Sequence, residues 1–390
     1  MSVPIWINGP YNLIRMEGKI NNINKVLYFF MDKHMPPNLQ SECPTLRNTH
    51  IRNYLIDQFD NLPENRTVDF FLETFPDMSG FVSKDSRSGI YLDQLRFMFE
   101  RIFKFDFKKN KVIKSDEFNI RLHYMDIRPY FTFTVSNPFS LTHDISNYIN
   151  DYPKKIILAK DVTMIRDGLD IFNSQLKIVY DALYPKKDGE NSQYLGKVPI
   201  IRKVKNFINY DKDDASRAIK YLINKLKFVY KNKEVKDKIN EIISGDLLHL
   251  FGEYTKISDQ IYDLLNSNKD ISVNDLLKLW GQQEDIIVFI FCLFVDMYFL
   301  RRVLDKDYVR TAITYTGGLH TANYVKYLVR KFDFHITHVY YSEIDNIGAL
   351  ERTIKDSKWS EPMDILSLLL PKDKDFYQCI NVSNFPKNFS

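Results

Sequence analysis

Histidine, carboxylate and arginine side chains stand directly behind four separate apolar runs of this chain. The runs and the residues that follow them are Val26–Phe30 with Asp32 and His34, Val68–Leu72 with Glu73, Phe118–Met125 with Asp126 and Arg128, and Ala312–Thr316 with Gly317, Gly318 and His320. These side-chain types perform acid–base catalysis and bind metal ions. The repetition predicts that residues far apart in the sequence meet at one site.

The first pair, Asp32 and His34, lies two positions apart. On an extended segment two such side chains point to the same side, so both could reach one ion or one polarised water. Alternatively, the two side chains simply solvate a surface loop. The residue types alone leave both interpretations open.

Glu73 follows an unbroken apolar run, which predicts a carboxylate that is partly buried at a strand end. A buried carboxylate must be paired, or its pKa rises, and either case marks a candidate functional group. Arg128 could clamp a carboxylate or phosphate with two hydrogen bonds, and it shares one face of its segment with Asp126. The structural alternative is that Arg128 only neutralises Glu73.

The strongest local motif is Gly317-Gly318-Leu319-His320, directly after an apolar run. Two glycines allow a tight strand-to-helix turn and the close approach of a ligand or cofactor to the backbone. His320 would then lie at the amino end of the next helix, where free N–H groups favour an anion. The alternative is a histidine that caps the helix or packs under the sheet.

The four apolar runs are short and rich in β-branched and aromatic residues, as strands covered on both faces are. If they are parallel, their carboxyl ends share the edge where open α/β sheets bind ligands. Between residues 138 and 305 helical periodicity replaces the strand signals. We therefore predict an α/β fold, a mostly parallel sheet flanked by helices, with a large all-helical insertion or cap. The core would comprise residues 1–137 and 306–390, and the insertion residues 138–305.

The composition is that of an ordinary soluble globular protein of 390 residues, long enough for more than one core. A net charge of +4 makes a nucleic-acid partner unlikely, because such binders carry a strongly basic stripe. The longest apolar run, Ile286–Val295, is too short to span a membrane. The N-terminus lacks a secretory core, and Cys43, Cys292 and Cys379 argue against a disulfide framework. These observations predict an intracellular protein.

Taken together, the motifs resemble the superfamily that includes the TraB/GumN/Tiki proteins, erythromycin esterases and ChaN-like proteins. That pattern has an early Gly-x-x-His, a Glu after the next strand, an Arg-bearing strand and a late Gly-x-x-His. Here the late motif is intact, Glu73 and Arg128 match, and Met31 stands where the early motif has Gly before His34. The match covers about residues 25–130 and 310–342. The composition also resembles uncharacterised proteins of mimivirus-like giant DNA viruses.

The resemblance implies metal- or histidine-dependent hydrolysis of a peptide or ester bond. His34, His320, Glu73 and Asp32 would be ligands of a divalent metal ion or bases acting on water, and Glu73, Arg128, His320 and Asp126 the catalytic residues. The alternative is a non-catalytic viral protein that uses the same scaffold to bind a protein partner. Either would be located in the host cytoplasm or the virion.

Overall fold

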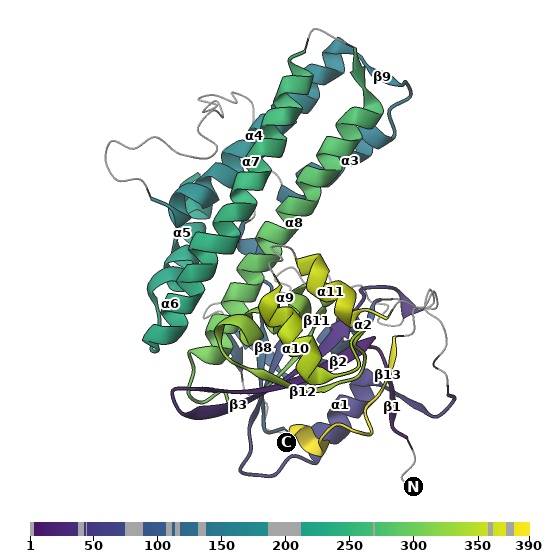
Figure 1. Cartoon of the computed structure of the whole chain (residues 1–390), viewed down its shortest axis with the longest axis vertical. Coiled ribbons are helices and arrows are strands. Elements are labelled where there is room, and N and C mark those ends of the chain that lie inside the picture. Colours follow the sequence, from purple (N-terminus) through teal and green to yellow (C-terminus); the bar gives the residue numbers. More distant parts are fainter. Residues whose placement is uncertain are drawn as a thin grey trace. The chain divides into compact units, whose positions relative to one another are not determined.

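In the computed structural model, the chain folds into two compact units (Figure 1). The structure describes residues 4–37, 43, 45–74, 89–106, 111–113, 118–131, 138–185, 212–267, 270–357, 362–371 and 378–390. An α/β unit contains residues 1–126 and 298–390, and a helical unit contains residues 127–297. The domain boundaries predicted at 137/138 and 305/306 stay predictions. One continuous helix, α8 (Val273–Leu304), contributes residues to both units.

The α/β unit is built on a six-stranded sheet with the order β12-β2-β3-β11-β5-β8. Its strands are β2 (Asn12–Ile20), β3 (Ile23–Asp32), β5 (Val68–Leu72), β8 (Ile120–Tyr124), β11 (Thr311–Gly317) and β12 (His335–Val339). The neighbours β3, β11, β5 and β8 are parallel, whereas β2 pairs antiparallel with both β3 and β12. The predicted α/β class is confirmed. A parallel-dominated sheet is not, because the pairings are of mixed orientation.

The four predicted runs form the four adjacent parallel strands of this sheet. All residues of β5 and β11 are buried, because helices cover both faces. Phe70 packs on one face against Phe99 of α2, whereas its neighbour Phe71 packs on the other against Phe299 of α8. This alternation follows from the two-residue period of a strand.

The hairpin of β2 and β3 was not predicted. Its two turn residues, Asn21 and Asn22, have φ values of 49° and 62°. Asparagine tolerates this left-handed conformation, which two-residue hairpin turns require. The Asn-Asn pair between two apolar segments is therefore the sequence signal for this hairpin.

The described residues of the α/β unit also form five further α-helices and a small sheet. The helices are α1 (Ile51–Asp60), α2 (Tyr91–Ile102), α9 (Gly318–Lys331), α10 (Ile347–Asp356) and α11 (Pro362–Leu369). The small sheet has the order β13-β1-β4, with β1 (Trp6–Asn8), β4 (Asn48–His50) and β13 (Cys379–Asn381). A separate hairpin joins β6 (Lys104–Asp106) and β7 (Lys111–Ile113).

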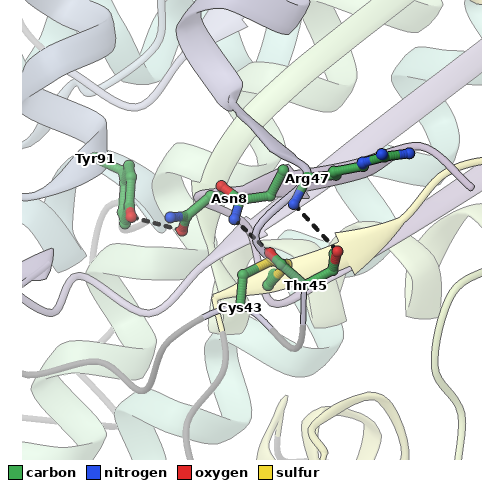
Figure 2. Close-up of a disulfide and its surroundings, with 7 residues drawn as sticks. Asn8, Cys43, Thr45, Arg47 and Tyr91 are labelled. Carbon is green, nitrogen blue, oxygen red and sulfur yellow. Dashed lines mark hydrogen bonds between the residues drawn. A yellow bond between two sulfur atoms is a disulfide. The ribbon is translucent and has the colours of Figure 1, made fainter.

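A disulfide bond joins Cys43 to Cys379 beside the small sheet, as Figure 2 shows. The expectation that the cysteines form no disulfide is therefore wrong. The expectation failed because it relied on sequence separation. The two cysteines are 336 positions apart in the sequence, but the fold brings their Cα atoms to within 5.5 Å. Cys292, within α8, is free and buried.

The helical unit consists of antiparallel helices around an apolar core. Its elements are α3 (Pro138–Asn150), α4 (Ala159–Leu183), α5 (Lys212–Phe228), α6 (Lys233–Ile242), α7 (Leu248–Leu265), most of α8, and the short strands β9 (Ile156–Ile157) and β10 (Ile271–Ser272). Figure 1 shows α4, α7 and α8 side by side. Leu169, Ile261 and Trp280 meet in their shared core. In the described part of the chain, no helix has the length and apolar character of a membrane span.

Candidate functional site

Three neighbouring parallel strands end at the candidate site. Asp32 is the last residue of β3, and its register partner is Gly317, the last residue of β11. Glu73 directly follows β5, and its backbone N–H donates to the carbonyl oxygen of Tyr315 at 3.3 Å. The sheet thus brings residues from three distant parts of the sequence to one edge.

Glu73 is the centre of the site, and its side chain is only 3% exposed. Its Oε2 accepts a hydrogen bond from the Gly317 N–H at 2.6 Å, and its Oε1 lies 3.1 Å from His320 Nε2. A longer contact of 3.5 Å joins Oε2 to His34 Nε2. Burial by itself would raise the pKa of Glu73, but the charges and hydrogen bonds of His320 and His34 hold this pKa well below its usual range. The anion expected at the amino end of α9 is therefore a side chain of the protein itself.

The His34 ring is the exposed member of the site, with 38% of its side chain accessible. Asp32 Oδ2 accepts from both Nδ1 of this ring, at 2.7 Å, and the His34 backbone N–H, at 3.1 Å. Burial lowers the pKa of His34, but hydrogen bonds and charges from Asp32 and Glu73 outweigh it and raise the pKa to about 10. The ring is therefore protonated at neutral pH.

The contact between His34 and Asp32 does not arise from an extended segment. The strand ends at Asp32, and His34 adopts a left-handed backbone conformation with a φ of 55°. The backbone therefore curls back over Asp32, which places the imidazole against the carboxylate. Such conformations are uncommon outside glycine and are concentrated at functional sites.

Two further residues hold Asp32, and sequence reasoning missed both. The Tyr315 hydroxyl donates to Asp32 Oδ1 at 3.0 Å, and Gln378 Nε2 donates to the same oxygen at 2.9 Å. Tyr315 lies in the apolar run Ala312–Thr316, two residues before the Gly317–His320 motif, and this position was a usable sequence signal. Gln378 follows no motif and is 346 residues from Asp32, so no local pattern indicates it.

The two glycines make room for side chains. A Cβ atom on Gly317 would lie 2.8 Å from His34 Nε2, and one on Gly318 would lie 2.1 Å from the Tyr11 hydroxyl. No ligand is needed to explain either glycine. The predicted cofactor-binding role of Gly317 and Gly318 thus stays a prediction.

The other two predicted catalytic residues, Asp126 and Arg128, follow the end of β8. The Asp126 backbone N–H donates to the carbonyl oxygen of Thr74 at 3.3 Å, one residue beyond Glu73. Arg128 begins a short 3-10 helix, Arg128–Phe131, in the helical unit. The catalytic roles predicted for Asp126 and Arg128 remain predictions.

The donor atoms of the site do not fit a metal ion in this arrangement. Both nitrogens of His34 face carboxylates, and both oxygens of Glu73 face histidine or backbone donors. Within the described ranges, no group of three or more His, Cys, Asp or Glu side chains could hold a metal ion.

Comparison with known proteins places the chain among uncharacterized viral proteins. The model of a family of unknown function, DUF5847, matches residues 5–275 and 252–390. Three uncharacterized proteins of Acanthamoeba polyphaga mimivirus are similar to the chain, with 31%, 31% and 29% identity. The alignments cover 99%, 98% and 98% of this chain and 98%, 96% and 97% of the relatives, respectively. No solved structure matches the chain. The predicted resemblance to giant-virus proteins is confirmed, whereas membership of the TraB and erythromycin esterase superfamily is not shown.

Proposed function

We propose that this protein, which belongs to the DUF5847 family of unknown function, is a hydrolase in which the His34 ring transfers protons. One observation carries the proposal: an exposed imidazole is held by a buried carboxylate on one nitrogen and faces a second carboxylate with the other. The resemblance of Glu73, Arg128 and Gly317-Gly318-Leu319-His320 to motifs of the TraB and erythromycin esterase superfamily supports the same class of reaction.

Asp32 fixes the tautomer and orientation of the His34 ring. Because Nδ1 is bound to Asp32, proton transfer takes place at Nε2. The contact of Nε2 with Glu73, at 3.5 Å, is the longest in the site. Of the contacts in the site, this one therefore requires the least free energy to break, and a substrate or a water molecule can take the place of Glu73 at Nε2.

With a water molecule at Nε2, the neutral ring accepts a proton as the water attacks a carbonyl carbon. The resulting imidazolium then donates this proton to the leaving group. Glu73, held by Gly317 and His320, stabilises the imidazolium through its charge. The bond cleaved would be an ester or a peptide bond.

The test is a panel of activated esters and labelled peptides, assayed with the wild-type protein and with His34→Ala and Asp32→Asn. We expect kcat/KM to increase with pH toward about 10, because only the neutral ring accepts a proton. His34→Ala should remove turnover, whereas Asp32→Asn should reduce it through the wrong tautomer. His143→Ala, at a ring with 67% exposure, is the control and should retain full activity. Equal turnover by wild type and His34→Ala would reject the proposal.

A second function is favoured by the pairing of the site residues with one another. Glu73 and His320 are each 3% exposed, so their ion pair can serve stability alone. Met31, in place of the glycine of the superfamily pattern, is also completely buried. In this case the protein is a non-catalytic scaffold that binds a protein partner. It would show no turnover on any member of the panel, and Glu73→Gln would lower its stability.

A further inference from the structure

The disulfide bond joins segments on opposite sides of the small sheet. Cys379 begins β13, and Cys43 precedes β4, while β1 lies between these strands and pairs with both. Within this sheet, Asn8 of β1 is the register partner of Cys379, and its side chain accepts a hydrogen bond from the Tyr91 hydroxyl at 2.6 Å (Figure 2). The disulfide therefore ties the first residue of β13 to the segment that precedes β4.

Gln378 stands immediately before Cys379 and reaches into the candidate site. Its side chain is buried, and Nε2 donates to both the Gly9 carbonyl oxygen and Asp32 Oδ1, the latter at 2.9 Å. The Gly9 N–H in turn donates to the Gln378 carbonyl oxygen at 2.7 Å. The residue next to the disulfide thus contacts the carboxylate that orients His34.

The Asp32 carboxylate is bound by four donor groups. Oδ1 accepts from Tyr315 and Gln378, and Oδ2 accepts from the backbone N–H and the ring of His34. Tyr315 belongs to the central strand β11, whereas Gln378 depends on a strand of three residues. Gln378 is therefore the donor whose position depends most on the disulfide.

We propose that Gln378 is a positioning residue for the Asp32–His34 pair, and that the Cys43–Cys379 disulfide is a redox-sensitive tether that holds it in place. The inference rests on the role of His34 in the proposed function. Reduction by a dithiol breaks the S–S bond and forms two S–H groups. The dithiol supplies two electrons and two protons and itself becomes a disulfide. Released from Cys43, β13 no longer keeps Gln378 against Asp32, and the His34 ring loses its fixed orientation.

The test measures the reactivity of His34 and does not need a substrate. Diethyl pyrocarbonate acylates imidazole nitrogens that carry a free electron pair, and mass spectrometry reports the rate at each histidine. In the oxidised protein both nitrogens of His34 face carboxylates, so acylation should be slow. After reduction with dithiothreitol, we expect a several-fold faster rate at His34. The exposed rings of His143 and His335 should react equally fast in both states.

Three variants separate the tether from the positioning residue. Cys379→Ser should show the faster His34 rate without reductant, whereas Cys292→Ser should keep the full redox response, since Cys292 is free. Gln378→Leu retains the disulfide but lacks the donor, so it should react fast at His34 even when oxidised. If substrates are found, reduction should lower kcat more than it changes KM.

Each part of the inference can fail separately. An unchanged His34 rate in a protein whose thiols titrate as reduced would exclude the tether. An unchanged rate in Gln378→Leu would exclude the positioning role. A loss of the far-UV circular dichroism signal on reduction would also overturn the tether, because the bond would then support the whole fold. An absence of turnover would remove the hydrolase proposal without affecting these rates.

Discussion

His34 combines an unfavourable backbone conformation with a favourable side-chain environment. A φ of 55° is uncommon for a residue with a Cβ atom, and such conformations persist where the surroundings determine them. Here Asp32 supplies those surroundings by accepting from both the backbone and the ring of His34. Sequence reasoning could find both residues from their position after an apolar run. It could not find the left-handed turn that brings them together.

The raised pKa of His34 makes the stability of the protein depend on pH. The folded pKa, about 10, lies above the ordinary value of 6.5, so the contribution is fully present below pH 6.5. It decreases as the pH rises and is lost above about 10. Urea denaturation of wild type and His34→Asn should therefore give a difference in unfolding free energy that shrinks steadily between these two pH values. A difference that stays constant over this range would contradict the assignment of His34 as an imidazolium.

The site leaves no room for a side chain at Gly317, because a Cβ atom there would lie 2.8 Å from His34 Nε2 and 3.4 Å from Glu73 Oε2. We expect Gly317→Ala to lower the unfolding free energy by about 1–3 kcal/mol, the usual effect of an added group in a packed site. The matched control is Gly281→Ala in α8, where an added Cβ meets nothing within 4 Å. That variant should gain up to about 1 kcal/mol, because alanine is the better helix former. Equal effects of the two substitutions in thermal denaturation would show that the site tolerates the methyl group.

At the scale of elements, a second charged cluster joins β5, β8 and α8. Asp69 of β5 is completely buried and accepts two hydrogen bonds from Arg121, at 2.7 and 2.6 Å. His123 of β8 lies 2.8 Å from Asp69 through Nε2 and 2.7 Å from Arg302 of α8 through Nδ1. The sequence indicated these strands correctly, because long apolar runs are strong signals. The side-chain partners depend on which strands are neighbours, which the sequence does not state.

Removal of Asp69 should lower stability strongly, because it leaves the half-buried Arg121 guanidinium and the His123 ring without their completely buried hydrogen-bond acceptor. We expect Asp69→Ala to lower the unfolding free energy by about 3–5 kcal/mol, as for other broken buried ion pairs. Glu100→Ala is the control, since its pair with Arg96 joins two partly exposed side chains one helical turn apart on α2. That substitution should cost only about 0.3–0.5 kcal/mol. Chemical denaturation of both variants measures the difference, and similar values would mean that the cluster contributes little.

At the scale of the whole molecule, the α/β unit is assembled from two distant parts of the chain. Strand β11, from the later part, lies between β3 and β5 of the earlier part. The sequence predicted this discontinuity through the change from strand to helix signals after residue 137. The sequence could not predict the disulfide or the contact of Gln378 with Asp32. Both depend on the pairing of β13, near the end of the chain, with β1.

A chain that ends at residue 297 tests this dependence. It keeps the complete helical unit, residues 127–297, but loses the strand between β3 and β5. We expect residues 4–126 to become sensitive to proteolysis, while the helical unit remains resistant and retains its far-UV circular dichroism signal. Full-length protein under the same conditions is the reference. Protection of residues 4–126 in the shortened chain would show that the early strands form a stable sheet by themselves.

The central position of β11 also determines when the candidate site can first assemble during synthesis of the chain. A ribosome adds about 5–20 residues per second, so the interval between the completion of β5 at Leu72 and of β11 at Gly317 is on the order of tens of seconds. Throughout this interval His34 and Glu73 lack the strand that brings them together. A nascent or prematurely terminated polypeptide therefore lacks the assembled site until β11 has been synthesised.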